Sequence, residues 1–237
     1  MKLFKAIQKS GISRRKASQL ILEGKVTVDS KKVIQPWHEV TENQEISIDG
    51  KKIKWSDTEE FLYYAFHKPS GYVTSLNDPK EHHIGEIIKN KKLKPVGRLD
   101  KDVSGLLILT NDGELIYKLT HPKYGVEREY ITTIVGKLSP KKIEKIKKGI
   151  KIGNEILKCE DIHIIEQNDT YSKVRIIMKQ GKKREIKRIF KRIGNRVIYL
   201  KRIRYGPVTI DIVPEQYQLK EITGNTLKEL LEIKKKN

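Results

Sequence analysis

Hydrophobic positions in residues 1–50 predict two short helices followed by two short strands. Gly11 is expected to end the first helix, and Ser13 is expected to cap the N-terminus of the second. Asp49 and Gly50 are a turn pair that closes the last strand. The inward-facing positions are Leu3, Phe4 and Ile7 in the first helix, Ala17, Leu20 and Ile21 in the second, and Val26, Val28, Ile46 and Ile48 in the strands.

Residues 51–60 are polar and predict a linker to a second domain over residues 61–237. In that domain strands and helices follow one another without a regular β-α-β alternation. The chain is therefore expected to be of the α+β class: a small α-α-β module followed by a domain with a mixed, mostly antiparallel sheet. Strands are predicted at Phe61–Lys68, Leu106–Thr110, Tyr130–Val135, Val174–Met178 and Val197–Arg202, and helices at Gly113–Leu119, Ser139–Lys148 and Lys182–Ile193.

Positive charge is concentrated in the second domain. The chain carries 50 Lys and Arg against 30 Asp and Glu, a net charge of +20. Residues 1–60 hold 12 basic and 9 acidic residues, whereas residues 179–204 alone hold 12 basic residues and one acid, Glu185. A general drift of composition would not cluster charge in this way. The pattern predicts a polyanionic partner such as nucleic acid.

The single cysteine, Cys159, rules out an internal disulfide and a cysteine-based zinc site. The six histidines show no metal-ligand spacing. The N-terminal segment MKLFKAIQKSG is too short and too polar for a signal peptide, and no stretch approaches 18 apolar residues. The expectation is a cytoplasmic protein without a membrane partner, and a monomer by default.

Two aspartates, Asp100 and Asp102, precede the apolar run Leu106–Leu109 in the segment GRLDKDVSGLLILTNDG. Two acids with this spacing resemble the signature of metal-dependent phosphotransferases of the haloacid dehalogenase type. In that signature the apolar strand precedes the first acid, whereas in this chain the apolar run follows both acids. The loop also resembles that of aspartic proteases, although a second such loop is absent. The remaining alternative is that both aspartates cap turns beside Gly97 and Gly105. That alternative is favoured for Asp102 and disfavoured for Asp100.

The first domain carries the segment SGISRRKASQLILEGKVTVDSKKV, which resembles the alpha-L RNA-binding module of a small-subunit ribosomal protein. Its second helix begins with Arg14, Arg15 and Lys16. Cations at a helix N-terminus oppose the helix dipole, so their presence predicts that they face RNA phosphates. These three residues are therefore expected to bind RNA.

Four motifs of the second domain occur in the order found in one enzyme family. They are HKPSGYVTS (His67–Ser75), PVGRLDKDVSGLLILTNDGEL around Asp100, HPKYGVEREYITTIVG (His121–Gly136) and KQGKKREIKRIFKRIGNRVIYLKRIRYGPV (Lys179–Val208). Together they resemble the RsuA/RluB family of ribosomal RNA pseudouridine synthases. The resemblance implies an isomerase that breaks the bond between uracil and ribose, rotates the base and rejoins it through carbon 5. It implies a catalytic carboxylate and no metal or organic cofactor.

The resemblance assigns roles to individual residues. Asp100 corresponds to the catalytic aspartate, Lys187 to the basic residue that pairs with it, and Tyr130 to the tyrosine that stacks on the target uracil. Arg98 corresponds to the arginine that contacts RNA as the base leaves its stack. The target uridine is expected to be single-stranded or flipped out of a structured stem-loop of ribosomal RNA. Further RNA contacts are predicted from the basic helix, at Lys183, Arg184 and Arg188.

Five positions depart from the family pattern, but none of them is Asp100, Tyr130 or Lys187. A non-catalytic ribosomal RNA-binding protein with the same fold is the alternative, and the presence of these three residues argues against it. The departures are His67 for a common asparagine, Arg128 for a lysine, Glu185 for a glutamine, and Glu215 and Gln218 for a glycine and an arginine.

Overall fold

The computed structural model describes residues 1–55 and 60–235 and divides the chain into two compact units, Met1–Glu60 and Phe61–Asn237. Residues 56–59 of the predicted linker lie outside the described residues. No helix within the described residues has the length and apolar character needed to cross a membrane.

The first unit packs two helices against a four-stranded antiparallel sheet with the order β2-β1-β3-β4. Its buried core consists of the inward-facing positions predicted from the sequence, except Phe4 and Ile48, together with Ala6 and Val40. Phe4 and Ile48 are partly buried and pack against this core. Ser13 caps the second helix by accepting a hydrogen bond from the Lys16 backbone N–H at 3.3 Å. The elements are α1 (Leu3–Lys9), α2 (Arg14–Leu22), β1 (Val26–Val28), β2 (Lys31–Lys32), β3 (Ile46–Ile48) and β4 (Lys51–Lys52).

The start of the predicted linker is wrong, because Lys51 and Lys52 form strand β4. They pair with Ile48 and Ser47 of β3. Asp49 and Gly50 both have positive φ angles, 48° and 75°, which suit a tight hairpin turn. This turn therefore continues the sheet instead of ending it. The lysines are polar because β4 is an exposed edge strand, not because they lie outside the fold.

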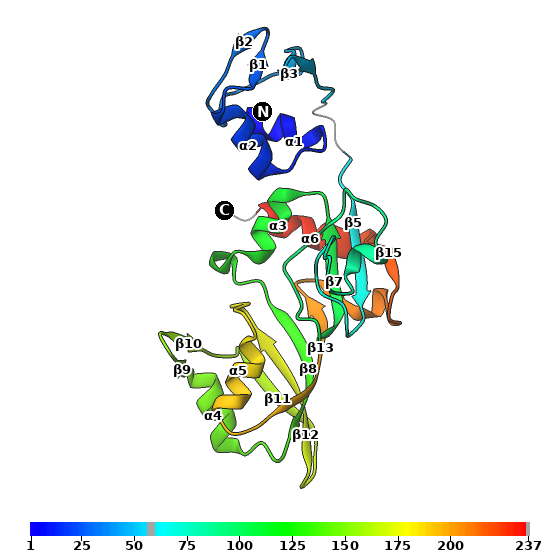
Figure 1. The fold of residues 1–237 in the computed structure, drawn as a ribbon. Coiled ribbons are helices and arrows are strands. Elements are labelled where there is room, and N and C mark those ends of the chain that lie inside the picture. Colours follow the sequence, from blue (N-terminus) through cyan, green and yellow to red (C-terminus); the bar gives the residue numbers. More distant parts are fainter. Residues whose placement is uncertain (56–59, 236–237) are drawn as a thin grey trace. The chain divides into compact units, whose positions relative to one another are not determined.

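The second unit is built on a nine-stranded sheet in which the described strands follow the order β11-β12-β8-β13-β7-β5-β15 (Figure 1). β6 and β14 pair beside this path. β13 and β7 are parallel, and the other described pairings are antiparallel, which confirms the α+β class. The strands are β5 (Tyr63–Lys68), β6 (Lys94–Pro95), β7 (Ser104–Thr110), β8 (Arg128–Val135), β9 (Ile150–Ile152), β10 (Glu155–Leu157), β11 (Asp161–Gln167), β12 (Tyr171–Met178), β13 (Val197–Tyr205), β14 (Val208–Thr209) and β15 (Leu219–Glu221).

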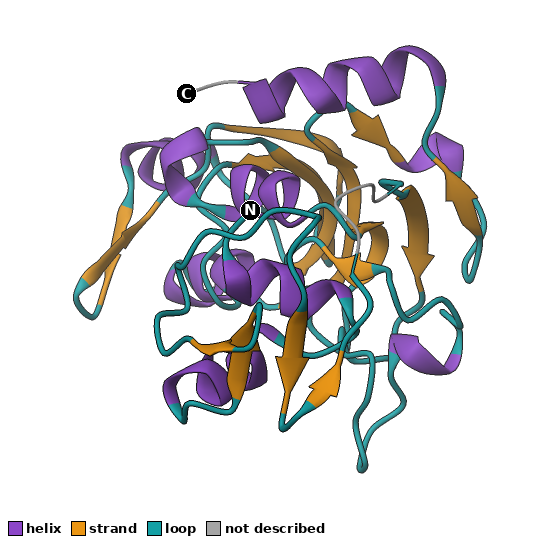
Figure 2. Cartoon of the chain, turned by 90° about the horizontal axis from the view of Figure 1, so that it is seen from above, coloured by secondary structure: helices purple, strands orange, loops and turns teal. Residues whose placement is uncertain are grey.

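Helices complete two cores on this sheet. α4 and α5 pack with β8, β11, β12 and β13, and α3 and α6 pack with β5 and β7. Figure 2 shows α6 as the helix that leads to the C-terminus. The helices are α3 (Gly113–Thr120), α4 (Pro140–Lys148), α5 (Glu185–Arg192) and α6 (Gly224–Lys235), with single 3-10 turns at Ile84–Glu86, Pro122–Tyr124 and Ile210–Ile212.

Strand β7 is buried on both faces, which explains its continuous apolar run. Leu106 and Ile108 lie in the core with α3 and α6, whereas Leu107 and Leu109 lie in a separate core on the opposite face. Successive side chains of a strand point to opposite faces, so both faces of β7 must be apolar. The turn that carries Asp100 is thus joined to a rigid central strand.

The predicted elements occur close to their expected positions, but one helix begins later than predicted and several short elements were not predicted. α5 begins at Glu185 and not at Lys182, because Arg184 adopts a left-handed conformation with φ of 52°. Helix α6, strand β11 and the short strands β6, β9, β10, β14 and β15 were not predicted. Most side chains of β11 are exposed, so that its hydrophobic pattern is weak.

Candidate functional site

A cavity of about 550 Å³ lies in the second unit, beside the segment that precedes β7, strands β8 and β13, and the start of α5. Segments from four separate parts of the sequence line it, and they include the predicted Asp100, Tyr130 and Lys187. Three basic residues expected to bind RNA also line the cavity, Arg98, Lys183 and Arg184. These six residues, separated by as many as 89 positions from Arg98 to Lys187, are therefore brought together by the fold.

The ammonium of Lys187 lies between the two aspartates. Its Nζ is 3.6 Å from Oδ2 of Asp100 and 2.5 Å from Oδ1 of Asp102. The Lys187 side chain is 14% exposed, against 36% for Asp100 and 66% for Asp102. Partial burial would raise the pKa of Asp102, but the hydrogen bond and the charge of Lys187 outweigh it and lower that pKa. The prediction that Lys187 lies beside Asp100 agrees with this geometry, while Asp102 is its closer partner.

Lys68, at the end of β5, holds the turn that follows Asp100. Its side chain is fully buried, and Nζ donates to the carbonyl oxygens of Pro69 and Val103, both at 2.8 Å. Burial lowers the pKa of Lys68 to about 8, although the nearby Asp102 and Asp100 act to raise it. An ammonium with several fixed acceptors restricts the backbone that supplies them.

Thr74 holds the other side of the turn. Its Oγ1 donates to the Leu99 carbonyl oxygen at 2.7 Å and accepts from the Leu99 N–H at 3.0 Å. Thr74 is buried, so these bonds are shielded from competing water. The backbone on both sides of Asp100 is therefore fixed by Lys68 at the end of β5 and by Thr74 in the segment after it.

Tyr130 lies on β8 in the middle of the sheet, opposite Ile176 of β12 and Arg202 of β13. It is partly buried against the core of α4 and α5, and it lines the same cavity as Asp100. A ring supported on one side and open to a cavity on the other is suited to stack on a planar base.

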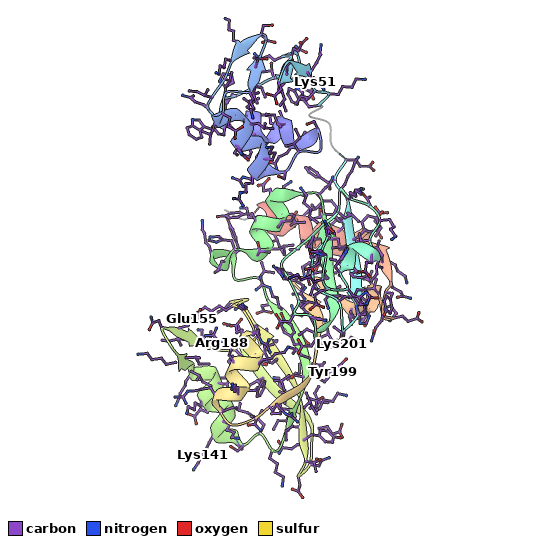
Figure 3. The ribbon with its side chains drawn as sticks, in the orientation of Figure 1. Lys51, Lys141, Glu155, Arg188, Tyr199 and Lys201 are labelled. Carbon is purple, nitrogen blue, oxygen red and sulfur yellow. The ribbon has the colours of Figure 1, made fainter. Side chains whose placement is uncertain are left out.

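The predicted RNA-binding residues have different environments. Lys183 and Arg184 are exposed at the cavity beside the start of α5, and Arg98 is exposed on the segment before Asp100. Arg188 is not among the cavity-lining residues. Its Nη2 lies 2.6 Å from Oε2 of Glu155 on β10, and both residues are marked in Figure 3.

In the first unit, the basic cluster of α2 is exposed. Arg14, Arg15 and Lys16 form the first turn of the helix. The guanidinium carbon of Arg14 lies 5.0 Å from the centroid of the Phe4 ring, which restricts that side chain. Backbone N–H groups at the start of a helix and these cations provide a surface suited to phosphate.

Two departures from the family pattern line the cavity. Arg128 is buried and donates from Nη2 to the Leu119 carbonyl oxygen and to the Tyr205 hydroxyl, both at 2.9 Å. Glu185 is also buried, and burial raises the pKa of its carboxyl. Its Oε2 accepts the Lys182 N–H at 3.0 Å, whereas Oε1 has no hydrogen-bond partner in the described part of the chain.

The other three departures are absent from the lining of this cavity. His67 is buried with Nδ1 2.9 Å from the Val213 carbonyl oxygen. Glu215 and Gln218 hydrogen-bond each other in the turn before β15, with Gln218 Nε2 donating to Glu215 Oε2 at 3.1 Å. All three residues therefore lie near β15 and outside the cavity.

Sequence reasoning missed Thr74 and Arg202. Thr74 lies in one of the four motifs, but the sequence does not indicate that this threonine is buried and hydrogen-bonds the backbone of Leu99. Arg202 lies in a run of basic residues, where solvation is the default expectation, and yet its side chain is 2% exposed and lines the cavity. The alternation of Leu200 with Arg202 on β13 was the one available signal that both face inward.

Comparisons with known proteins identify the family of this chain. A family model described as RNA pseudouridylate synthase matches residues 62–192, and an S4 domain model matches residues 1–46. The chain is 37% identical over 246 residues to an uncharacterized RNA pseudouridine synthase of Aquifex aeolicus (strain VF5), covering 100% of this chain and 99% of that protein. It is 36% identical over 212 residues to ribosomal large subunit pseudouridine synthase B of Bacillus subtilis (strain 168), covering 86% and 85%.

Among solved structures, a pseudouridylate synthase crystal structure matches with a TM-score of 0.68 and 26% sequence identity. The match covers 97% of this chain and 99% of that chain. The family resemblance stated from the four motifs and the N-terminal module is thereby confirmed.

Proposed function

Since this chain belongs to the RNA pseudouridylate synthase family, we propose that it isomerises a specific uridine of ribosomal RNA to pseudouridine. The observation that carries the proposal is the shared cavity of Asp100, Tyr130 and Lys187. A reactive carboxylate, a ring for stacking and a cation beside the carboxylate are the groups that this isomerisation needs. Ribosomal RNA as the substrate is supported by the name of the Bacillus subtilis relative and by the basic surface.

In this proposal Asp100 reacts with the target nucleotide. A carboxylate can attack as a nucleophile, or it can stabilise and deprotonate the sugar cation that forms when the uracil departs. The Asp100 side chain is 36% exposed, so a flipped nucleotide can reach it from the cavity. Lys187 balances the charge of the carboxylate and holds it in place. The reaction draws on the residues of this chain alone.

Tyr130 is proposed to stack on the target uracil. Stacking of a base on an aromatic ring stabilises binding by about 1–3 kcal/mol, and it holds the base parallel to the ring. Such a contact retains the base after the bond to ribose has broken, while still allowing the base to rotate in its own plane.

RNA docking is proposed to involve both units. Arg14, Arg15 and Lys16 would contact phosphates through the first unit, and Arg98, Lys183 and Arg184 would contact the strand that enters the cavity. Arg188 can take part only by sharing its guanidinium with Glu155. The predicted monomeric state and cytoplasmic location remain predictions.

Two alternatives receive less support. A non-catalytic RNA-binding protein would not need a buried threonine and a buried lysine to hold the turn at Asp100. A metal-dependent phosphotransferase would need a cation between Asp100 and Asp102, where the Lys187 ammonium lies. A second positive charge at that point would be repelled.

The proposal is tested by replacing Asp100 with Asn and measuring pseudouridine directly in ribosomal RNA transcripts. D100N is expected to make no product and to bind RNA with nearly the wild-type affinity, because the fold and the basic residues are unchanged. Product from D100N would refute the assignment of Asp100. Mapping pseudouridines in ribosomal RNA from cells with and without this protein identifies the uridine, and no difference at any position would refute the ribosomal substrate.

A further inference from the structure

Three buried charged residues of the described chain line the cavity without a part in the proposed function, namely Arg128, Glu185 and Arg202, and Arg202 is the most buried of them. It lies on β13 with its Cα opposite that of Tyr130 on β8 and that of Gly105 on β7. It thus lies between the stacking tyrosine and the strand that follows Asp100. Its side chain is 2% exposed and lines the cavity. Directly opposed residues of paired strands share a face of the sheet, so Arg202 and Tyr130 project to the same side.

The Arg202 guanidinium has a hydrogen-bond partner in the protein at Nε but none at Nη2 within the described residues. Nε donates to the Leu106 carbonyl oxygen at 2.7 Å, which holds the side chain against β7. Nη2 is buried and has no hydrogen-bond partner among the residues that the structure describes. The guanidinium carbon lies 4.8 Å from the centroid of the Tyr205 ring, which supports its position without supplying an acceptor.

A buried donor on a charged group is normally paired, because leaving it unpaired forfeits its hydration. The unpaired Nη2 of Arg202 therefore indicates an acceptor that arrives with the ligand. Uracil has two carbonyl oxygens, whereas cytosine carries an amino group in place of one of them. Of the groups that a flipped nucleotide brings into a cavity with Tyr130 and Asp100, a carbonyl oxygen of the base is the acceptor nearest to the stacking ring.

We propose that Arg202 binds a carbonyl oxygen of the target uracil through Nη2 and stabilises the negative charge that this base acquires during the reaction. The inference rests on the proposed function. When the bond between C1′ of ribose and N1 breaks, its electron pair stays on the uracil and spreads to O2 and O4. The C1′–C5 bond then forms, C5 releases its proton and N1 takes up a proton, so the composition of the nucleotide is unchanged. A fixed cation at one carbonyl oxygen favours the step in which the charge appears.

The inference is tested with Arg202→Met in single-turnover reactions at saturating RNA. Loss of a preorganised donor to a developing oxyanion slows reactions by about 100- to 1,000-fold, and R202M is expected to lose rate on this scale while binding RNA nearly as the wild type does. Lys141→Met is the matched control, because it removes the same charge from the exposed surface of α4 (Figure 3). K141M is expected to keep the wild-type rate, and an R202M enzyme that also keeps it would overturn the inference.

A purely structural role for Arg202 is separated by changing the base instead of the protein. RNA with 2-thiouridine or 4-thiouridine at the target position presents sulfur, a weaker acceptor, at one carbonyl position. The wild type is expected to slow with one of the two thio-RNAs, whereas R202M should not slow further with that RNA. Equal penalties in both proteins for both thio-RNAs would show that Arg202 does not touch the base.

Two further controls distinguish an unfolded variant, an incorrect proposed function and an incorrect role for Arg202. If circular dichroism shows that R202M is unfolded, Arg202→Lys, which keeps the charge but lacks Nη2, is tested with the same thio-RNAs. R202K is expected to show a smaller penalty than the wild type with the thio-RNA that slows the wild type, and an equal penalty would overturn the inference. A wild type that makes no pseudouridine in ribosomal RNA contradicts the proposed function and, with it, this inference. An active wild type beside an equally active R202M contradicts the role of Arg202 alone.

Discussion

The Lys187 ammonium lies 2.5 Å from Oδ1 of Asp102, closer than it lies to the carboxylate of Asp100. Asp102 thus competes for the cation that the proposed mechanism assigns to Asp100. The arrangement gives Asp102 a role beyond closing a turn: it holds the Lys187 side chain at the edge of the cavity, where the ammonium can serve both carboxylates.

Asp102→Asn is expected to slow the reaction by about tenfold, equivalent to a loss of about 1.4 kcal/mol of transition-state stabilisation, because Lys187 loses its closest partner. Single-turnover measurement of pseudouridine formation checks this rate. The matched control is Glu81→Gln, which removes the exposed ion pair between Lys101 and Glu81 beside the same turn. A D102N rate equal to that of E81Q would show that Asp102 does not position Lys187.

Asp102 also makes a pH-dependent contribution to stability. Its pKa is lowered in the folded state, so the stabilisation is present above the unfolded pKa of 3.8 and is lost as the pH falls through the folded pKa. Since Asp102 is 66% exposed, D102N is expected to lower the free energy of unfolding at pH 7 by at most about 1 kcal/mol. Urea titrations at pH 7 and pH 2.5 measure the difference, which should be smaller at the lower pH.

Lys68→Met is expected to destabilise the protein and slow the reaction, because the Pro69 and Val103 carbonyl oxygens lose a common donor. The pKa of Lys68 falls from 10.5 to about 8 on folding, so between these pH values the unfolded chain binds the additional proton. The unfolding free energy of the wild type should therefore rise relative to that of K68M from pH 8 to pH 10.5. A constant difference across this range would contradict the lowered pKa.

Glu185→Gln is expected to stabilise the protein at pH 7. Burial raises the pKa of Glu185 above its ordinary value of 4.5, so the folded state binds the proton more tightly and wild-type stability decreases as the pH rises through the folded pKa. Glutamine keeps an oxygen to accept the Lys182 N–H and has no charge to bury. Thermal unfolding should show a higher midpoint for E185Q at pH 7 and no gain at pH 4, and a gain of equal size at both would disprove the explanation.

Gly105→Ala is expected to destabilise the second unit. A Cβ at Gly105 would lie 2.2 Å from the Arg202 carbonyl oxygen, and its φ of +109° adds about 1–3 kcal/mol of backbone strain for a non-glycine residue. Gly113→Ala is the control, since it opens helix α3 and a Cβ there meets nothing within 4 Å. Urea unfolding should separate the two variants, and equal stability would contradict the close approach of β7 and β13.

Many helices and strands of this protein could be predicted from local sequence patterns. The two helices of the first unit, the strand Leu106–Leu109 and the helix begun by Pro140 follow from spacing, capping residues and turns, because those signals act within a few residues. The motifs likewise identified Asp100, Tyr130 and Lys187 in chain order, and hence the family. The sequence did not predict β11, because most of its side chains are exposed and its apolar residues do not alternate with polar ones.

The sequence by itself thus determined the class of fold, the family and the chemistry-bearing residue types, since each depends on residues close together in the chain. The tertiary structure alone decided which of two aspartates Lys187 holds more closely, that Lys68 and Thr74 fix the turn at Asp100, and that Arg202 is buried beside Tyr130. These relationships join residues 25 to 96 positions apart, as Thr74 with Leu99 and Leu106 with Arg202 illustrate. Burial and long-range pairing arise only when the sheet brings such residues together, so no local pattern can contain them.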